Sequence, residues 1–388
     1  MAIIARGEPG ITETLREGWV TEPLGKVGKW FSGGTPRMSE AQYWYGDIPW
    51  VSPKDMKVAR INDTVDHVTN LAIGNGTRVI PTGTVLMVVR GMILARAFPV
   101  AIAAKPLAFN QDVRALVTRE GVESSYVLYW LQSKESQFLS ICSESTHGTK
   151  RIPSESLFAQ ELALPPLPEQ RAIATALSDV DALLAGLDAL IAKKRDLKQA
   201  ALQQLLTGKQ RLPGFSGAWE VRRLGAVLSV RHGKSQHAVV ASNGTYPILA
   251  TGGEIGRTNT FLYDKPSVLI GRKGTIDRPQ YQESPFWTID TLFYTEVAAT
   301  AYPKFMYYAF HTIDWSSYSE ASGVPSLNAS TIENIVFNCP EVNEQRAMAA
   351  VLSDMDAELA ALAARRDKTS ALKQGMMQEL LTGRIRLL

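Results

Sequence analysis

The stretch EQRAIATALSDVDALLAGLDALIAKKRDLKQAALQQLLTGKQRL, residues 169–212, decides the architecture because it occurs twice. Residues 344–387 repeat it without a gap as EQRAMAAVLSDMDAELAALAARRDKTSALKQGMMQELLTGRIRL, and 25 of the 44 aligned positions are identical. An internal repeat of this kind indicates a duplicated structural unit. Each copy follows more than a hundred residues of mixed composition. The chain is therefore predicted to alternate variable block, long helix, variable block, long helix.

Both copies carry the signals of a long amphipathic helix. Asn343 suits a helix start and Gly208 and Gly383 suit left-handed helix ends. A helix of about 38 residues would be roughly 57 Å long, and neither copy can bury such a stripe alone. If the repeats obey a two-fold axis, the two helices pair antiparallel. The apolar residues alternate steps of four and three, as in a coiled-coil seam: Ile173, Leu177, Val180, Leu184, Leu187 and Ile191, then Met348, Leu352, Met355, Leu359 and Leu362.

The two blocks before the helices begin alike. At an offset of 200, Trp219, Leu224, Gly225, Val227 and Gly233 repeat Trp19, Leu24, Gly25, Val27 and Gly33. Short β-type runs bounded by turn residues predict strands at 48–51, 84–89, 93–98, 109–117, 246–249, 267–270 and 288–295. Helices are predicted at 11–17, 124–139 and 303–312, and short helix starts at 152–157 and 327–332.

The predicted fold class is α+β, with a pseudo-two-fold repeat. Two mixed α/β recognition domains, at 1–165 and 213–340, are separated by helices at 166–212 and 341–388 that form an antiparallel coiled-coil spacer. A chain of 388 residues is too long for one ordinary core. Its 45% hydrophobic and 20% charged residues are typical of a globular protein.

The remaining bulk properties limit the class of protein. A net charge of +3 permits a nucleic-acid partner without requiring one. Two cysteines, Cys142 and Cys339, favour a reducing, cytoplasmic compartment over a disulfide framework. The first residues lack the pattern of a signal peptide, and no run approaches the roughly twenty apolar residues of a membrane span.

The sequence contains no recognisable catalytic motif. It has no G-x-x-x-x-G-K-[ST] phosphate loop, no Cys/His spacing typical of zinc and no Asn/Asp-Pro-Pro-aromatic motif of an amino-methyltransferase. Its five histidines are scattered. We therefore expect no catalytic residue, metal or cofactor in this chain.

A rod that holds two unlike modules apart suits duplex DNA, whose successive major grooves on one face lie about 34 Å apart. Unlike modules would read an asymmetric, bipartite target. Basic and amide side chains in loops are the candidates for phosphate and base contacts, with solvated surface charge as the alternative for each. They are Lys54, Arg90, Arg96, Asn110, Gln111, Lys150 and Arg151 in the first block, and His232, Lys234, Arg257, Arg272, Lys273 and Arg278 in the second.

Other polar positions have two interpretations. Lys193, Lys194 and Arg195 in mid-helix are either a solvated helix face or a contact with DNA between the half-sites. The helix starts are predicted to dock partner proteins or to fix the angle between module and helix, although capping alone could explain the glutamates. These residues are Glu169, Gln170 and Arg171 in the first copy and Glu344, Gln345 and Arg346 in the second.

The sequence also carries a family resemblance. PPLPEQRAIATALSDVDALLAGLDALI with LLTG, repeated as NEQRAMAAVLSDMDAEL with LLTG, resembles the conserved regions of the DNA specificity (S) subunit of type I restriction-modification enzymes. GKWFSGGTP, DIPWVSPKDM and SVLIGRKGTID resemble segments of that family's target recognition domains. The resemblance covers nearly the whole chain, in the family's order.

The resemblance implies a non-catalytic subunit that reads double-stranded DNA. It also implies docking to two modification subunits, which methylate adenine with S-adenosylmethionine, and to up to two restriction subunits, which use ATP and Mg²⁺. The alternative is a coiled-coil interaction scaffold whose modules bind proteins. A self-sufficient nuclease or methyltransferase is disfavoured by the missing motifs.

Overall fold

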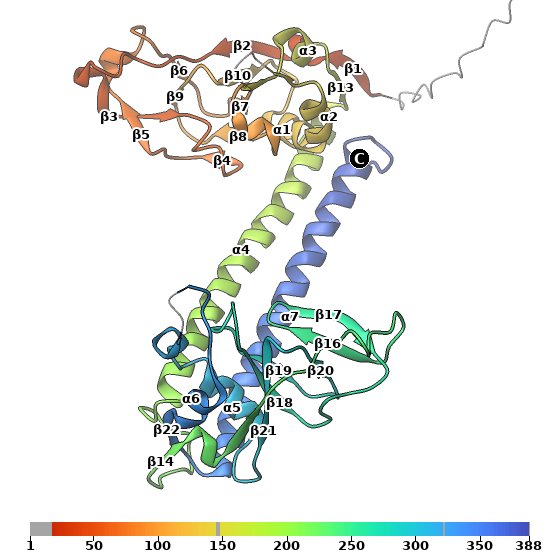
Figure 1. Cartoon of the computed structure of the whole chain (residues 1–388). Helices are drawn as coiled ribbons and strands as arrows, with labels where there is room; N and C mark the ends of the chain where they lie inside the picture. The colour runs from red at the N-terminus through yellow and green to blue at the C-terminus, as the bar shows by residue number, and fades with distance from the viewer. Residues whose placement is uncertain (1–17, 145–147, 321–322, 388) are drawn as a thin grey trace, which may run out of the picture. The chain divides into compact units, whose positions relative to one another are not determined.

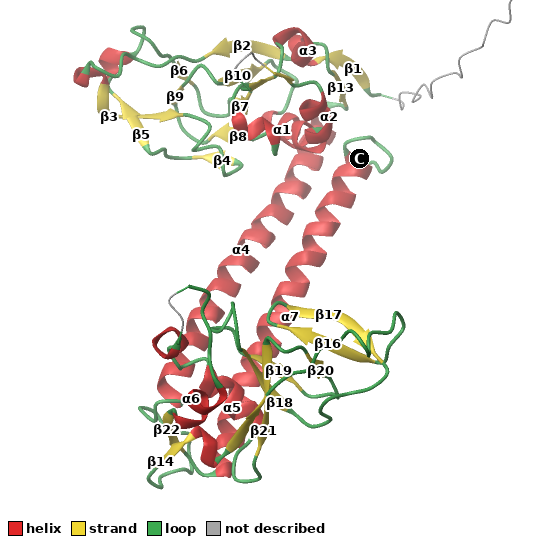
Figure 2. Ribbon diagram, in the orientation of Figure 1, coloured by secondary structure: helices red, strands yellow, loops and turns green. Residues whose placement is uncertain are grey.

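The computed structural model describes residues 18–144, 148–320 and 323–387; the helix predicted at 11–17 lies outside them. The chain forms two compact units. The first comprises Met1–Gly186 and Arg366–Leu388, and the second comprises Leu187–Arg365. Figure 1 colours the chain from its N-terminus to its C-terminus, and Figure 2 shows the helices and strands of each unit.

The two repeats form two helices of 39 residues each, α4 (Leu167–Leu205) and α7 (Val342–Leu380). In the first unit the start of α4 lies beside the end of α7, because Lys373 Nζ is 2.6 Å from Asp181 Oδ1. In the second unit Lys198 Nζ is 2.5 Å from Asp356 Oδ1, so the end of α4 lies beside the start of α7. The paired halves therefore run antiparallel in each unit, as predicted (Figure 1).

The first unit carries a module built on two sheets. The wholly buried strands β7 (Val85–Val88) and β8 (Val100–Ala103) lie in its five-stranded sheet, and helix α1 (Ser124–Ser133) packs against both. The five-stranded order is β2 (Gly28–Ser32), β10 (Val113–Thr118), β7 (Val85–Val88), β8 (Val100–Ala103), β4 (Arg60–Ile61). The four-stranded order is β5 (Asp66–Val68), β3 (Trp44–Val51), β9 (Leu107–Phe109), β6 (Val79–Ile80). Shorter elements complete it: the pairs β1 (Val20–Pro23) with β13 (Glu161–Leu164) and β11 (Ser143–Glu144) with β12 (Lys150–Arg151), and helices α1 (Ser124–Ser133), α2 (Glu135–Ser140) and α3 (Ser154–Phe158).

The module of the second unit repeats this plan. Its sheets are β15 (Leu228–Arg231), β21 (Leu292–Val297), β18 (Ser267–Gly271), β19 (Gln280–Gln282), and β17 (Gly253–Thr258), β16 (Tyr246–Ala250), β20 (Trp287–Thr288). Strand β14 (Glu220–Arg223) pairs with β22 (Val336–Cys339), and the helices are α5 (Pro303–Phe310) and α6 (Ala329–Asn334). Within the described residues, strands β4 and β6 of the first module have no counterpart here, in line with the longer first block.

Short 3₁₀ helices connect these elements: η1 (Leu24–Lys26), η2 (Ala41–Tyr43), η3 (Asn70–Ala72), η4 (Met92–Ala95), η5 (Leu224–Ala226) and η6 (Trp315–Tyr318). The strand predicted at 93–98 is wrong, because this segment forms η4 after Gly91, whose φ of 137° strongly favours glycine. The helix predicted at 124–139 is broken at Lys134, which leaves the helical conformation between α1 and α2. The single strands predicted at 109–117 and 288–295 are each two strands of different sheets, joined by a tight turn.

Each module shares its hydrophobic core with the helices. Ile173 and Leu177 of α4 are buried with the sheet residues of the first unit, and Leu380 of α7 joins them. Met348 and Leu352 of α7 take the matching places in the second unit. The apolar seam predicted from the repeat therefore serves the modules as well as the helix pair. Among the described residues, no helix is long and apolar enough to cross a membrane.

Candidate nucleic-acid interface

Three segments of the first module meet beyond the end of strand β7. Val89 N donates to Asp112 O (2.8 Å), Gly91 N donates to Lys150 O (3.0 Å), and Ile152 N donates to Val89 O (2.9 Å). These backbone bonds join the strand end to the β9–β10 turn and to the segment before α3. They bring predicted residues that are far apart in sequence to one cleft of about 480 Å³, whose lining includes Arg90, Gln111, Arg114, Arg151 and Glu155.

Positive charge dominates this cleft. Arg90 Nε lies 2.6 Å from Asp112 Oδ1, and Arg114 Nη2 donates to Ser154 Oγ at 3.2 Å. Arg151 is exposed. Guanidinium groups bind phosphate oxygens and guanine edges through paired hydrogen bonds. The cleft is therefore suited to nucleic acid.

Arg114 is not among the DNA-contacting residues predicted from the sequence. It is the second residue of β10, between the buried residues Val113 and Ala115. The available signal was a single charged residue within the apolar run of this strand, since a charge is rarely placed there without a polar partner.

Asn110 shapes the turn beside the cleft. It is 5% exposed, its Oδ1 accepts from Asp112 N (3.0 Å), and its Nδ2 donates to Asp112 Oδ2 (3.3 Å). Both ends of the amide are thus used within the turn, in contrast to the base contact predicted for it. Gln111 is exposed and accepts from Thr35 Oγ1 at 2.6 Å.

The other predicted residues of the first module lie at the edge of the cleft or elsewhere. Lys150 Nζ lies 2.9 Å from Glu144 Oε2. Lys54 lies after β3, and its hydrogen bond to Asp66 (2.6 Å) raises the pKa of the ammonium group. Arg96 is exposed at the end of η4. Lys54 and Arg96 do not line the cleft.

The second module builds the same junction from different side chains. Arg272 N donates to Thr291 O (2.8 Å), Gly274 N donates to Pro325 O (2.9 Å), and Leu327 N donates to Arg272 O (2.9 Å). Lys273 therefore occupies the position equivalent to Arg90. Ser326 forms a backbone β-bridge with Lys273, as Arg151 does with Arg90, and so occupies the position equivalent to Arg151. The framework is common to both modules, while the groups it presents differ.

The remaining candidates of the second module lie around this framework. Lys234 N donates to Thr288 O (2.8 Å), as Gly34 N does to Phe109 O in the first module. The His232 ring packs edge-on against Phe293 at 4.9 Å between centroids. Arg257 Nε lies 3.0 Å from Glu254 Oε1, and Arg278 is exposed.

A glycine fixes the approach of two backbone segments in each module. A Cβ atom at Gly33 would lie 2.2 Å from Asn110 O, and one at Gly233 would lie 1.9 Å from Ile289 O. Such contacts do not occur in folded proteins, so these positions require glycine. Close packing of the backbone therefore explains both glycines.

The helix starts hold buried ionic clusters. Glu169 is 1% exposed; Trp19 Nε1 donates to its Oε2 (3.2 Å), and Arg386 Nη2 donates to the same oxygen (2.7 Å). The second unit repeats the cluster: Glu344 is fully buried and accepts from Trp219 Nε1 (3.1 Å) and Arg211 Nη2 (2.6 Å). Each glutamate of one repeat is thus neutralised by an arginine from the end of the other repeat.

The neighbouring glutamines fasten each module to its helix. Gln170 Nε2 donates to Pro165 O (2.8 Å) while its Oε1 accepts from Glu123 N (2.9 Å). Gln345 does the same with Pro340 O (2.9 Å) and Tyr302 N (2.8 Å). Burial leaves these glutamates and glutamines no surface for a partner protein.

The two arginines of the helix starts remain accessible. Arg171 lies 3.6 Å from Glu123 with 65% of its side chain exposed, and exposed Arg346 lies over the Tyr302 ring at 4.7 Å. Partner docking stays a prediction for this pair.

A tyrosine links each module to the helix pair. Tyr129 Oη donates to Asp181 Oδ2 (2.9 Å) and Tyr308 Oη donates to Asp356 Oδ2 (2.7 Å). Burial and the nearby carboxylate raise the pKa of both tyrosines. Lys373 and Lys198 complete these triads from the opposite repeat, so the pseudo-two-fold extends to individual side chains.

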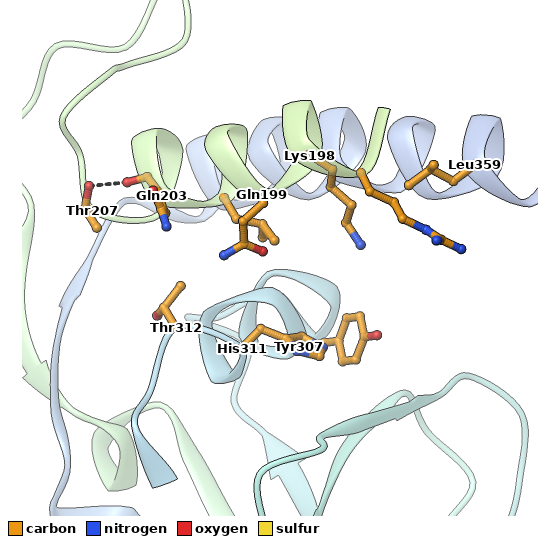
Figure 3. A pocket seen from close by; sticks show the side chains of 10 residues that line it. Lys198, Gln199, Gln203, Thr207, Tyr307, His311, Thr312 and Leu359 are labelled. Carbon is orange, nitrogen blue, oxygen red and sulfur yellow. Dashed lines mark hydrogen bonds between the residues drawn. The ribbon is translucent and has the colours of Figure 1, made fainter. Parts of the chain in front are cut away.

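The second unit contains a cavity of about 640 Å³ between α4 and α5 (Figure 3). Arg195, Lys198, Tyr307 and His311 lie along it, and burial, then the charge of Lys198, lowers the pKa of His311. Of the mid-helix basic residues, Lys194 pairs with Glu358 (2.6 Å), while Arg195 faces the cavity. In the described ranges, no group of three His, Cys, Asp or Glu side chains could hold a metal ion.

Comparison with known proteins gives the family. A model of the type I restriction modification DNA specificity domain matches residues 16–193 and 217–369. The specificity subunit of the Escherichia coli type I restriction enzyme EcoR124I/EcoR124II is 31% identical over 189 residues, which cover 48% of this chain and 47% of that subunit. The specificity subunit of the type I restriction enzyme MjaIX from Methanocaldococcus jannaschii is 29% identical over 255 residues, covering 60% of this chain and 57% of that subunit. The chain thus matches about half the length of these two relatives.

A solved structure has the same fold. The S subunit of a type I restriction-modification system from M. genitalium superposes with a TM-score of 0.65 at 16% identity, covering 95% of this chain and 97% of that one. At this low sequence identity, the likeness shows a shared fold alone. The family match extends over both modules and most of both long helices. The chain therefore belongs to the family of type I restriction modification DNA specificity proteins.

Proposed function

We propose that this chain reads an asymmetric, bipartite DNA target, with one half-site bound by each module. The observation that carries the proposal is the shared junction. The same backbone bonds present Arg90 and Arg151 in the first module but Lys273 and Ser326 in the second. A common framework with unlike side chains would place two different sets of base contacts on equivalent stretches of duplex.

The antiparallel helices would set the distance between the half-sites. An insertion of one or two helical turns after Leu187 in α4, with a matching insertion in α7, is expected to lengthen the DNA spacer that the protein accepts. An unchanged spacer would refute this part of the proposal.

The chain would act without catalytic groups of its own. Two modification subunits would bring S-adenosylmethionine and methylate adenine, and up to two restriction subunits would bring ATP and Mg²⁺. Arg171 and Arg346, which are exposed at the same position of the two helix starts, support two copies of one partner, because they present the same group in both units. A cytoplasmic location fits the two free thiols, Cys142 and Cys339.

Mapping adenine methylation in the genome with and without the gene would define both half-sites. Replacing residues 19–160 with another module should then change one half-site and leave the other intact. Two altered half-sites would contradict the assignment of one half-site to each module.

Substitution in the cleft tests the contacts. Arg90→Ala should weaken binding of the modification complex to its target about 5- to 150-fold, as expected for a lost base or phosphate contact. A phosphate contact would also lower the slope of log K against log[salt] by about 1. Arg119→Ala is the matched control, because Arg119 is equally exposed (45% against 46%) and also pairs with one carboxylate, Glu22, but does not line the cleft.

The same titrations separate the alternative function. A protein-binding scaffold would show no preference for its duplex target and no steep salt dependence. Equal affinity of the Arg90→Ala and Arg119→Ala complexes would refute the role of the cleft.

A further inference from the structure

Tyr45 in strand β3 has an unusual backbone conformation. Its φ is 62°, the one positive value at a non-glycine position in the described part of the chain. A bulky residue rarely adopts this left-handed region, and such strain persists only where the surroundings impose it. The side chain is 94% exposed, so the conformation does not serve to bury the ring.

The residues on either side of Tyr45 are anchored. Trp44 is 9% exposed, its Nε1 donates to Arg37 O (3.2 Å), and its ring packs edge-on against Trp50. A Cβ atom at Gly46 would lie 2.4 Å from Val68 O, so the backbone there is pressed against strand β5. The register between β3 and β5 shifts between Trp44 and Ile48. An irregularity of this kind re-aims a side chain, and here it directs an aromatic ring to solvent.

The ring belongs to an exposed apolar patch. Met38 is 73% exposed and Val65 is 75% exposed, and both line one hollow of about 460 Å³ with Tyr45. The carboxylate of Asp66, at the edge of this hollow, is paired with Lys54. A cluster of large apolar side chains held in solvent marks an interaction site.

The exposed ring of Tyr45 has no counterpart at the equivalent position of the second module. Gly244 packs against Thr258 as Gly46 packs against Val68, and Leu249 O accepts from Ile289 N as Val51 O accepts from Asn110 N. Both correspondences have an offset of 198, which places Asn243 at the position of Tyr45. Asn243 is not in the left-handed region. A partner that binds the two modules equivalently would not need this feature.

The segment that carries Met38 is tied to the lining of the cleft of the first module by one hydrogen bond. Thr35 Oγ1 donates to Gln111 in the cleft, and Met38 follows three residues later, at most about 11 Å away. Between them lies Arg37, which is exposed and forms no ion pair among the described residues. Asp47 is also exposed; a carboxylate there disfavours a phosphate but can accept from the amino group of cytosine.

We propose that Tyr45 is an aromatic wedge that stacks on an unstacked base of the half-site read by the first module, with Arg37 on the neighbouring phosphate. Apolar and aromatic side chains inserted at a base step kink the duplex, and any base offers a face for stacking. The inference rests on the proposed function. It adds that the two half-sites are deformed unequally, because the second module carries no such ring at the equivalent position.

The test uses the complex with its modification subunits and duplexes carrying 2-aminopurine at successive positions of the first half-site. Binding of the wild-type complex should raise the 2-aminopurine fluorescence at one base step, where the base is unstacked. Tyr45→Gly should abolish that rise and weaken binding about 5- to 150-fold, while Tyr45→Phe should keep the rise and bind within about twofold of wild type. Glycine adopts positive φ without steric strain, so Tyr45→Gly should melt at the same temperature as wild type or higher. An unchanged or higher melting temperature shows that weaker binding is due to lost stacking and not to unfolding. Asn243→Ala is the matched control and should leave the signal unchanged.

An unchanged fluorescence rise and affinity in Tyr45→Gly would overturn the wedge while the proposed function stands. Normal DNA binding combined with weaker retention of the modification subunits would also overturn it, since the patch would then be a protein contact. If the wild-type complex shows no target-specific binding, the proposed function itself fails.

Discussion

The buried cluster of Glu169, Trp19 and Arg386 gives a quantitative prediction about the stability of the first unit. Glu169 is 1% exposed in the intact unit, and in Arg386→Ala its carboxylate keeps the indole Nε1 of Trp19 as a donor but loses its cationic partner. Removing one partner of a buried ion pair costs about 3–5 kcal/mol. Because Arg386 itself is 32% exposed and the indole N–H remains, we expect the low end, about 3 kcal/mol. For a unit of this size that lowers Tm by about 6–12 °C.

The matched control lies two residues earlier in the chain. Arg384 pairs with Glu379 at 3.5 Å, and its side chain is 59% exposed. An exposed pair contributes about 0–1 kcal/mol, so Arg384→Ala should melt close to wild type. Differential scanning calorimetry and urea titration, each fitted for both units, measure these differences.

A double variant sharpens the reasoning. Glu169→Gln together with Arg386→Ala leaves no buried charge, so it should be more stable than Arg386→Ala alone. The electrostatic account is wrong if the double variant loses the sum of the two single effects, or if Arg386→Ala melts like Arg384→Ala. Arg211→Ala should act in the same direction on the second unit, through Glu344.

Two further predictions concern the second unit. Gly233→Ala would force a Cβ atom to 1.9 Å from Ile289 O and should prevent the module from folding, whereas Gly252→Ala, which meets no atom within 4 Å, should fold normally; circular dichroism and solubility distinguish the two, and a soluble, native-like Gly233→Ala would contradict the close approach. Burial lowers the pKa of His311 below its ordinary value of 6.5, so the unfolded state binds more protons between the two pKa values and stability must fall as the pH drops from about 7 through that window. His311→Gln should remove that part of the pH dependence of Tm, and an unchanged pH profile would show that the imidazole does not contribute.

Much of the architecture was predictable because the sequence contains an apolar periodicity and an internal repeat. The seam that includes Ile173, Leu177, Met348 and Leu352 fixed both helices, and Gly208 and Gly383, at φ of 69° and 66°, end them as expected. The gapless repeat also predicted the antiparallel pairing. Local patterns of this kind depend on neighbours in sequence.

The errors occurred where tertiary contacts decide the structure. Asn110 reads as a polar residue inside an apolar run, and only its two bonds to Asp112 reveal a turn between two sheets. The apolar run after Gly91 resembles a strand in sequence, but the chain leaves β7 before Gly91 and forms a 3₁₀ helix after it.

The candidate site was predictable in part. Arg90, Gln111 and Arg151 could be chosen one by one, but their meeting depends on backbone bonds between segments some 20 to 60 positions apart, such as that from Ile152 N to Val89 O. Burial of Glu169 and Gln170 could not be inferred from the sequence, since a helix start usually faces water.

The division of the units has a consequence for synthesis on the ribosome. The second unit is one uninterrupted stretch, Leu187–Arg365, so all its parts are available once residue 365 has emerged. The first unit also contains residues from 366 onward. Glu169 cannot pair with Arg386 until that residue has been synthesised, 217 positions later. The module translated first is therefore completed last. A chain that ended soon after residue 365 would have a whole second unit, whereas its first unit would hold the Glu169 carboxylate without the arginine that compensates its charge.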